Sequence, residues 1–124
     1  VPVAGANDGG GSIRIPAACC GLFGLKPGRG RTPWGPTFTE AMHGIAVNHV
    51  LTRSVRDSAL LLDIAQGDER GSLFRIAPPE QAYARSAASR PGKLRIGFST
   101  RSPLGTEVSP EAVRAVGGST PPDR

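Results

Sequence analysis

The sequence predicts an α/β fold, because helix-like and strand-like patterns both occur within its 124 residues. The clearest helix pattern covers residues 54–66, where apolar residues recur with the spacing of one helix face. The clearest strand pattern covers residues 94–98, where Leu94, Ile96 and Phe98 alternate with other residue types. A chain of this length has room for about one domain, so we expect one α/β domain.

Short elements are expected before residue 29. Residues 1–4 are apolar and predict the end of a strand, and the glycines of residues 5–11 predict a flexible loop after it. Residues 16–20 predict a short helical turn, because proline is favoured at the first position of a helix. Residues 22–25 predict a short buried strand, which the Lys-Pro-Gly sequence of residues 26–28 ends.

The helix of residues 54–66 has recognisable ends. Ser54 is expected to be its N-cap, with Asp57 in the first turn, and Gly67 supplies the stop. Apolar residues occupy so much of its circumference that we expect neighbouring elements to cover it on nearly all sides. These apolar residues are Val55, Ala59, Leu60, Leu61, Leu62, Ile64 and Ala65.

The remainder of the chain is expected to hold one strand and one helix. Residues 68–92 are polar and contain prolines, so they predict a surface connection to the strand of residues 94–98. A helix is expected to open at Ser109, and the Gly-Gly pair after Val116 is expected to cut it off.

Composition and charge argue against several classes of protein. The formal net charge is +5, but aromatic residues make up only 5% of the chain, whereas nucleic-acid binders usually show a continuous basic stripe with aromatic residues between the charges. A small nucleic-acid-binding module is therefore supported by the charge alone. No apolar run approaches the roughly 18–20 residues of a membrane span, and no signal-peptide pattern opens the chain. We expect a cytoplasmic protein that binds neither nucleic acid nor membranes.

The two cysteines, Cys19 and Cys20, are adjacent in sequence. Neighbouring cysteines cannot form a long-range disulfide, which favours a reducing compartment. They also lack the Cys-x-x-Cys spacing of a zinc site, so a metal site with His43 and His49 is not expected. The expectation is a protein without a metal or a cofactor.

The most informative stretch covers residues 7–14, Asn-Asp-Gly-Gly-Gly-Ser-Ile-Arg. Successive glycines let several backbone N–H groups turn toward one point, and Ser12 follows them directly. This suits acyl transfer, in which a serine hydroxyl attacks a carbonyl carbon and N–H donors stabilise the resulting oxyanion. An ordinary glycine-rich turn is the alternative on loop chemistry alone. The phosphate-binding and dinucleotide-binding glycine patterns do not fit, because their spacings differ.

A longer match points to a known family. Residues 8–33 resemble the signature region of the amidase signature family, roughly G-[ST]-D-x-G-G-S-I-R-x-P-A followed by a C-G pair and G-L-K-P-[ST]-x-G-R. Residues 51–63 resemble the family's T-R-[ST]-V-x-D-x-A-x-x-L-D helix, and residues 93–100 resemble the strand that follows it. The matching residues of the signature region are Asp8, Gly10, Gly11, Ser12, Ile13, Arg14, Pro16, Ala17, Cys20, Gly21, Gly24, Leu25, Lys26, Pro27, Gly30 and Arg31.

The resemblance implies a fold and a reaction. The family fold is an α/β fold with a mixed sheet flanked by helices, and this chain would supply a partial amidase-signature domain over residues 1–116 with a divergent tail at 117–124. Ser12 matches the acylated nucleophile of carboxamide hydrolysis, and the substrate would be a small-molecule linear or cyclic amide. The backbone N–H groups of the oxyanion hole match the three glycines Gly9, Gly10 and Gly11.

Other residues of the signature region are expected to have supporting roles. Asp8 and Arg14 flank the glycines and are expected to pair and hold the shape of the loop. Trp34, Phe38 and Met42 are expected either to line a substrate channel or to pack in the core.

The family uses a Ser–Ser–Lys triad, and two of its members are not matched in this chain. The lysine and the bridging serine correspond to positions before Val1, and Lys26 matches a structural turn of the family. We therefore expect the isolated chain to lack the general base of Ser12 and to be inactive, because triad members act as a unit. The alternative hypothesis is a truncated, non-catalytic fragment.

Overall fold

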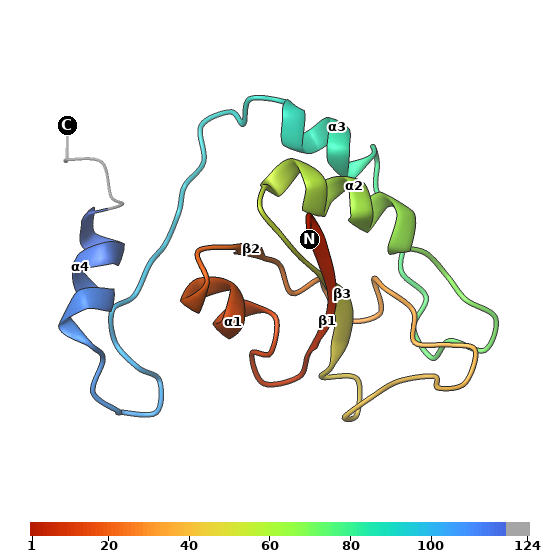
Figure 1. Cartoon of the computed structure of the whole chain (residues 1–124), viewed down its shortest axis with the longest axis horizontal. Helices are drawn as coiled ribbons and strands as arrows, with labels where there is room; N and C mark the ends of the chain where they lie inside the picture. The colour runs from red at the N-terminus through yellow and green to blue at the C-terminus, as the bar shows by residue number, and fades with distance from the viewer. Residues whose placement is uncertain (119–124) are drawn as a thin grey trace. The chain divides into compact units, whose positions relative to one another are not determined.

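The computed structural model describes residues 1–118, and its contacts divide the chain into two units, Val1–Arg90 and Pro91–Arg124. The elements of the first unit, in chain order, are β1 (Val3–Asp8), α1 (Arg14–Cys19), β2 (Phe23–Gly24), β3 (Val47–Thr52), α2 (Val55–Ala65) and α3 (Tyr83–Ala88) (Figure 1). The second unit contains α4 (Pro110–Gly118). The predicted α/β class is confirmed.

The three strands form one sheet with the order β1-β3-β2, so β3 lies in the middle. Both strand pairs are antiparallel, and the register of the first pair runs from Val3 opposite Thr52 to Asp8 opposite Val47. A mixed sheet was expected for the family fold, and the part of the sheet formed by this chain is antiparallel. Strand β3 thereby holds the end of β1, where the glycine-rich segment begins.

Strand β1 is longer than the sequence predicts. The prediction of a loop over residues 5–11 was wrong for residues 5–8, which continue the ladder with β3, and residues 9–11 lie outside any strand or helix as predicted. Strand β3 itself was not predicted, although Val47 and His49 are buried on either side of half-buried Asn48. Pairing with a distant strand therefore overrides the local preference of glycine for loops.

Helix α1 packs closely on β2, and a glycine permits the approach. The predicted helical turn of residues 16–20 begins earlier, at Arg14. A Cβ atom on Gly24 would lie 2.6 Å from the Cβ of Ala17 and 3.0 Å from the carbonyl oxygen of Ile13. Ile13 and Ala17 are both buried, so this contact forms one part of the small apolar core. The buried apolar residues are Ile13, Ala17, Ala46, Val47, Ala59 and Leu62.

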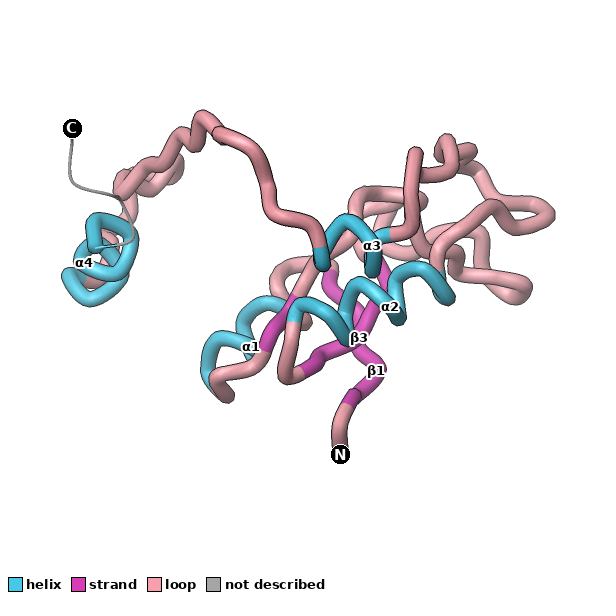
Figure 2. Tube along the Cα trace, turned by 90° about the horizontal axis from the view of Figure 1, so that it is seen from above, coloured by secondary structure: helices cyan, strands magenta, loops and turns pink. Residues whose placement is uncertain are grey.

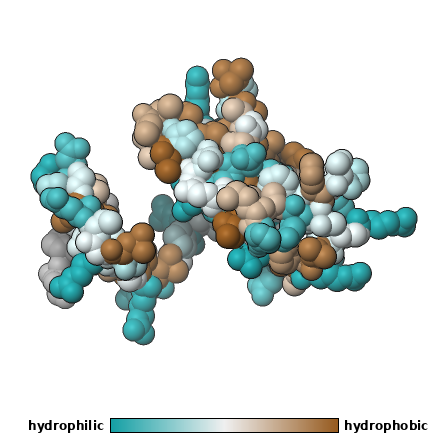
Figure 3. Space-filling model, turned by 90° about the horizontal axis from the view of Figure 1, so that it is seen from below, coloured by the Kyte–Doolittle hydropathy of each residue, from teal (hydrophilic) through white to brown (hydrophobic). Residues whose placement is uncertain are grey.

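Helix α2 confirms the predicted N-cap, since the hydroxyl of Ser54 accepts a hydrogen bond of 3.1 Å from the backbone N–H of Asp57. The prediction that neighbours cover the helix on nearly all sides was wrong. Leu60 and Ile64 are 53% and 72% exposed, because the contacts of α2 with β2, β3 and α3 lie on its other face. Other hydrophobic residues are visible on the opposite face of the chain, which is seen from below (Figure 3).

Helix α3 replaces part of the predicted surface connection of residues 68–92. Its first backbone N–H groups, those of Tyr83 and Ala84, donate to the carboxylate of Asp63 at 2.7 and 2.9 Å. A carboxylate at a helix N-terminus satisfies N–H groups that have no partner within the helix. The remaining connections, between β2 and β3 and between α2 and α3, are long loops (Figure 2).

A buried histidine links the sheet to α2. His49 of β3 is 5% exposed, and its Nε2 lies 2.9 Å from the hydroxyl oxygen of Ser58, which is also buried. Its Nδ1 is buried and has no hydrogen-bond partner among residues 1–118. Burial lowers the pKa of His49, because the charged imidazolium loses its hydration.

We expect the free energy of unfolding to fall as the pH drops below about 6.5, the pKa of an unfolded histidine. The folded chain keeps His49 neutral while the unfolded chain binds a proton there, so acid favours unfolding by at most about 1.4 kcal/mol per pH unit. Urea unfolding above and below this pH measures the slope of the free energy of unfolding against pH. The variant His49→Gln should lose most of it, and His43→Gln, at an exposed position, should keep it. An unaltered slope in His49→Gln would refute the assignment.

The second unit corrects another prediction. Residues 94–98 form no strand, and Leu94 and Ile96 are 67% and 79% exposed. An alternating pattern becomes a strand only where another strand pairs with it, and within residues 91–118 none does.

Helix α4 begins at Pro110 as predicted but continues through Gly118, so the Gly-Gly pair does not end it. Residues 119–124 of the predicted tail lie outside the described part of the chain. In that described part, no helix has the length and apolar character needed to cross a bilayer.

Candidate active site

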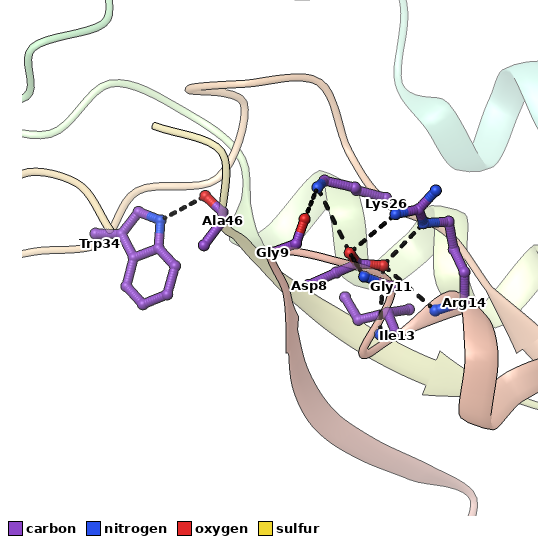
Figure 4. Close-up of polar contacts among 8 residues, drawn as sticks. All are labelled: Asp8, Gly9, Gly11, Ile13, Arg14, Lys26, Trp34 and Ala46. Atoms are coloured by element: carbon purple, nitrogen blue, oxygen red, sulfur yellow. Dashed lines mark hydrogen bonds and ion pairs between the residues drawn. The ribbon is translucent and has the colours of Figure 1, made fainter. Parts of the chain in front are cut away.

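The glycine loop, residues 9–12, connects the end of β1 to the start of α1 (Figure 4). Gly11 has a φ angle of 132°, a conformation that residues with side chains rarely adopt. A Cβ atom on Gly11 would also lie 2.6 Å from Cδ1 of Ile15. Glycine is therefore required at this position for the chain to turn from the strand into the helix.

Asp8 lies at the centre of the loop and is fully buried. Its carboxylate accepts hydrogen bonds from the backbone N–H groups of Gly11, Ile13 and Arg14 at 2.7, 3.3 and 3.4 Å. The guanidinium of Arg14 adds two contacts, 2.9 Å from Nε and 3.1 Å from Nη2. The guanidinium and these N–H groups hold the pKa of Asp8 well below its usual range despite burial. The charged carboxylate thus fixes the backbone on both sides of Ser12.

Lys26 reaches the same loop from the residues after β2. Its Nζ donates to the carbonyl oxygen of Gly9 at 2.8 Å and lies 3.5 Å from Oδ1 of Asp8. The side chain is 23% exposed, whereas that of Arg14 is 52% exposed. The sequence placed Lys26 in a structural turn and gave no sign of this contact, which joins residues far apart in sequence.

The backbone N–H groups of the loop differ in their partners. That of Gly11 is engaged by Asp8. Within residues 1–118, the N–H groups of Gly9, Gly10 and Ser12 donate to no protein atom. These three groups are available to an external acceptor.

Ser12 is exposed, and its hydroxyl has no hydrogen-bond partner among the described residues. Neither histidine is hydrogen-bonded to it: His49 is bonded to Ser58, and His43 is exposed. Lys26 is bonded to Gly9 and Asp8. No described side chain therefore accepts a hydrogen bond from the hydroxyl of Ser12.

A second segment lies against the glycine loop. A Cβ atom on Gly9 would be 2.5 Å from Sδ of Met42 and 3.8 Å from the Cβ of Ala46. Nε1 of Trp34 donates to the carbonyl oxygen of Ala46 at 3.2 Å (Figure 4). Phe38 is 63% exposed and Met42 is 62% exposed, so neither packs in the core. Met42 therefore borders the loop that carries Ser12.

Other possible sites lie away from Ser12. An open apolar hollow of about 330 Å³ lies between β2, α2 and α3, and none of the predicted site residues lines it. Cys19 and Cys20 are both free and exposed. Among residues 1–118, no three or more His, Cys, Asp or Glu side chains are grouped as metal ligands.

Comparison with known proteins identifies the family. The amidase family model matches residues 1–119. The chain is 42% identical over 120 residues to the 6-aminohexanoate-cyclic-dimer hydrolases of Pseudomonas sp. (strain NK87) and Paenarthrobacter ureafaciens, covering 94% of this chain and 24% of each hydrolase. The chain thus spans about a quarter of the length of these relatives.

Solved structures agree with the sequence match. A structure of 6-aminohexanoate cyclic dimer hydrolase has a TM-score of 0.86 and 42% identity, over 94% of this chain and 25% of that one. A bacterial aryl acylamidase of the amidase signature family has a TM-score of 0.58 and 37% identity, and the match covers 71% of this chain and 18% of the acylamidase chain. The resemblance predicted from the sequence is confirmed, and the chain belongs to the amidase signature family.

Proposed function

We propose that this chain carries the nucleophile of an amidase, which hydrolyses carboxamides through an acyl-Ser12 intermediate. The observation that supports this best is the exposed hydroxyl of Ser12 beside the unengaged N–H groups of Gly9 and Gly10. A hydroxyl without an internal partner is free to meet a substrate, and nearby N–H groups stabilise the charge that develops on the carbonyl oxygen.

The proposed reaction has two steps. In the first, Oγ of Ser12 attacks the carbonyl carbon and loses its proton to a general base, while the oxyanion binds the N–H groups of Gly9 and Gly10, since that of Gly11 is engaged by Asp8. The C–N bond then breaks and the nitrogen takes up a proton. In the second, water attacks the ester, releases the carboxylic acid and restores Ser12. These steps balance without a metal or a cofactor.

The base is proposed to be the bridging serine and lysine that the family resemblance places outside this chain. Amidase activity therefore belongs to a protein that includes them, and the 124-residue chain alone is proposed to be inactive. The observation that favours inactivity is that no described residue is hydrogen-bonded to the hydroxyl of Ser12. Residues 1–116 are proposed to be the amidase part of the chain.

We propose a small linear or cyclic amide as the substrate, because the hydrolases that match 94% of this chain are named for a cyclic dimer of 6-aminohexanoate. The cytoplasm is the proposed compartment, because the adjacent cysteines are free thiols, which persist in reducing surroundings.

Fluorophosphonate labelling tests the nucleophile. A hybrid enzyme, in which residues 1–116 replace the matching segment of the Paenarthrobacter ureafaciens hydrolase, supplies the parts outside this chain. After treatment with a fluorophosphonate, mass spectrometry should place the adduct on Ser12 of the hybrid, and the 124-residue chain should remain unlabelled. An adduct on any other residue of the segment, with Ser12 unmodified, would overturn the proposal.

A further inference from the structure

The ammonium of Lys26 donates a hydrogen bond to a neutral backbone carbonyl, that of Gly9. The Nζ to oxygen distance is 2.8 Å, and the lysine side chain is only 23% exposed. Pairing with Asp8 does not by itself account for this placement, because Arg14 already contacts both carboxylate oxygens of Asp8 and the Lys26 contact is longer, at 3.5 Å. The close contact of Lys26 is the one with the glycine loop (Figure 4).

This contact fixes the direction of one N–H group. The carbonyl of Gly9 and the N–H of Gly10 belong to the same trans peptide, so both bonds lie in one plane and point in opposite directions. A glycine pair has unusual backbone freedom, and the plane would otherwise rotate easily. Holding the oxygen on Lys26 therefore aims the Gly10 N–H, which donates to no atom of residues 1–118, away from Lys26.

The same contact polarises the peptide. A hydrogen bond from an ammonium draws electron density toward the carbonyl oxygen, and the N–H at the other end of the amide becomes a stronger donor. A donor that is oriented and polarised before substrate binds needs little reorganisation when negative charge develops. Asp8 cannot do this for Gly10, because its carboxylate binds the N–H of Gly11 instead.

We infer that Lys26 is a positioning residue of the oxyanion hole, which orients and polarises the Gly10 N–H through the Gly9–Gly10 peptide. The inference rests on the proposed function and adds to it a role for a residue that contacts neither Ser12 nor the reacting atoms.

Nuclear magnetic resonance of the 124-residue chain tests the peptide relay without requiring activity. Lys26→Met removes the ammonium but keeps a long apolar stem, and Lys26→Arg keeps a charged donor. In Lys26→Met, the carbonyl carbon of Gly9 and the amide proton of Gly10 should both shift upfield, as expected for a weaker hydrogen bond and a less polarised amide. Lys26→Arg should restore most of both shifts. The matched control is Lys93→Met, at the only other lysine, which is exposed. If the Gly9 carbonyl carbon shifts while the Gly10 amide proton stays unchanged, Lys26 does not polarise the Gly10 N–H and the inference is wrong.

Kinetics of the hybrid enzyme test the consequence. Lys26→Met should lower kcat about 10–100-fold, somewhat less than the roughly 10²–10³-fold cost of losing a whole oxyanion donor, with KM nearly unchanged. Lys26→Arg should recover most of kcat. A merely structural role predicts a lower melting temperature with kcat per folded molecule unchanged, and that result would overturn the inference. If Ser12→Ala leaves the hybrid fully active, the proposed function fails instead. The resonance shifts of the isolated chain then test by themselves whether Lys26 polarises the Gly10 N–H through the Gly9–Gly10 peptide.

Discussion

Replacing Ser12 by alanine is expected to lower kcat of the hybrid enzyme for the cyclic amide by up to about 10⁶-fold, the order of the loss when the nucleophilic serine is removed from a catalytic triad. The side chain is exposed and has no hydrogen-bond partner in the described residues, so its loss breaks no internal hydrogen bond. The chemistry is removed while the fold is kept. Hydrolysis measured by release of the linear product reports the effect.

The control for this prediction is Ser99→Ala, which removes the hydroxyl of another exposed serine. It should leave kcat unchanged, and both variants should keep the circular dichroism spectrum and the melting temperature of the unsubstituted hybrid. A tenfold loss of activity is about what the loss of one hydrogen bond would cause. If Ser12→Ala retained a tenth or more of the activity, the assigned nucleophile would therefore be wrong.

Replacing Asp8 by asparagine is expected to lower the free energy of unfolding by about 2–4 kcal/mol, because a buried charge that satisfies several donors is lost. The carboxylate accepts from the N–H groups of Gly11, Ile13 and Arg14. An asparagine has nearly the same shape, but its NH₂ group would face donors and leave at least one of them unpaired. Urea unfolding of the 124-residue chain measures the change.

The pH dependence of this difference provides a second check. The pKa of Asp8 is lowered in the folded chain, so its contribution is present above about pH 3.9, the unfolded value, and is lost as the pH falls toward the folded value. The stabilities of Asp8→Asn and the unsubstituted chain should therefore converge in acid. Glu107→Gln, at an exposed carboxylate, is the control and should change neither quantity. A loss of stability below about 0.5 kcal/mol at neutral pH would show that Asp8 does not organise the loop.

Local signals in the sequence predicted the elements whose ends are set by near neighbours. Ser54 caps α2 through Asp57, only three residues away, and Pro110 opens α4. Helix α3 was missed because its N-terminal partner is Asp63, which lies 20 residues before Tyr83. A cap at that distance in sequence leaves no signal in a local pattern.

Strands were harder to predict than helices, because a strand depends on its partner. Residues 5–8 are strand because β3 pairs with them, despite their loop-like composition. Residues 94–98 have the ideal alternation but no pairing strand in the described part of the chain. Alternating hydrophobicity indicates which residues could face a core, and pairing decides whether a strand forms.

The candidate site was predictable as a motif, and its internal contacts were not. The spacing of Asp8, Ser12 and Arg14 marks the loop in the sequence. The bond from Lys26 to Gly9 joins residues 17 apart, and the approach of Met42 to the loop spans more than thirty. These contacts follow from the pairing of β3 with both β1 and β2, so only the folded structure reveals them.

The most direct test of the proposed amidase chemistry is to trap the covalent intermediate formed with a substrate. Attack of a serine on a cyclic amide opens the ring without releasing a fragment, so the adduct has the whole mass of the cyclic dimer. Acid quenching of the hybrid enzyme during turnover, followed by peptide mass spectrometry, should find this added mass at Ser12. Turnover accompanied by the added mass on a different residue would contradict an acyl-Ser12 mechanism.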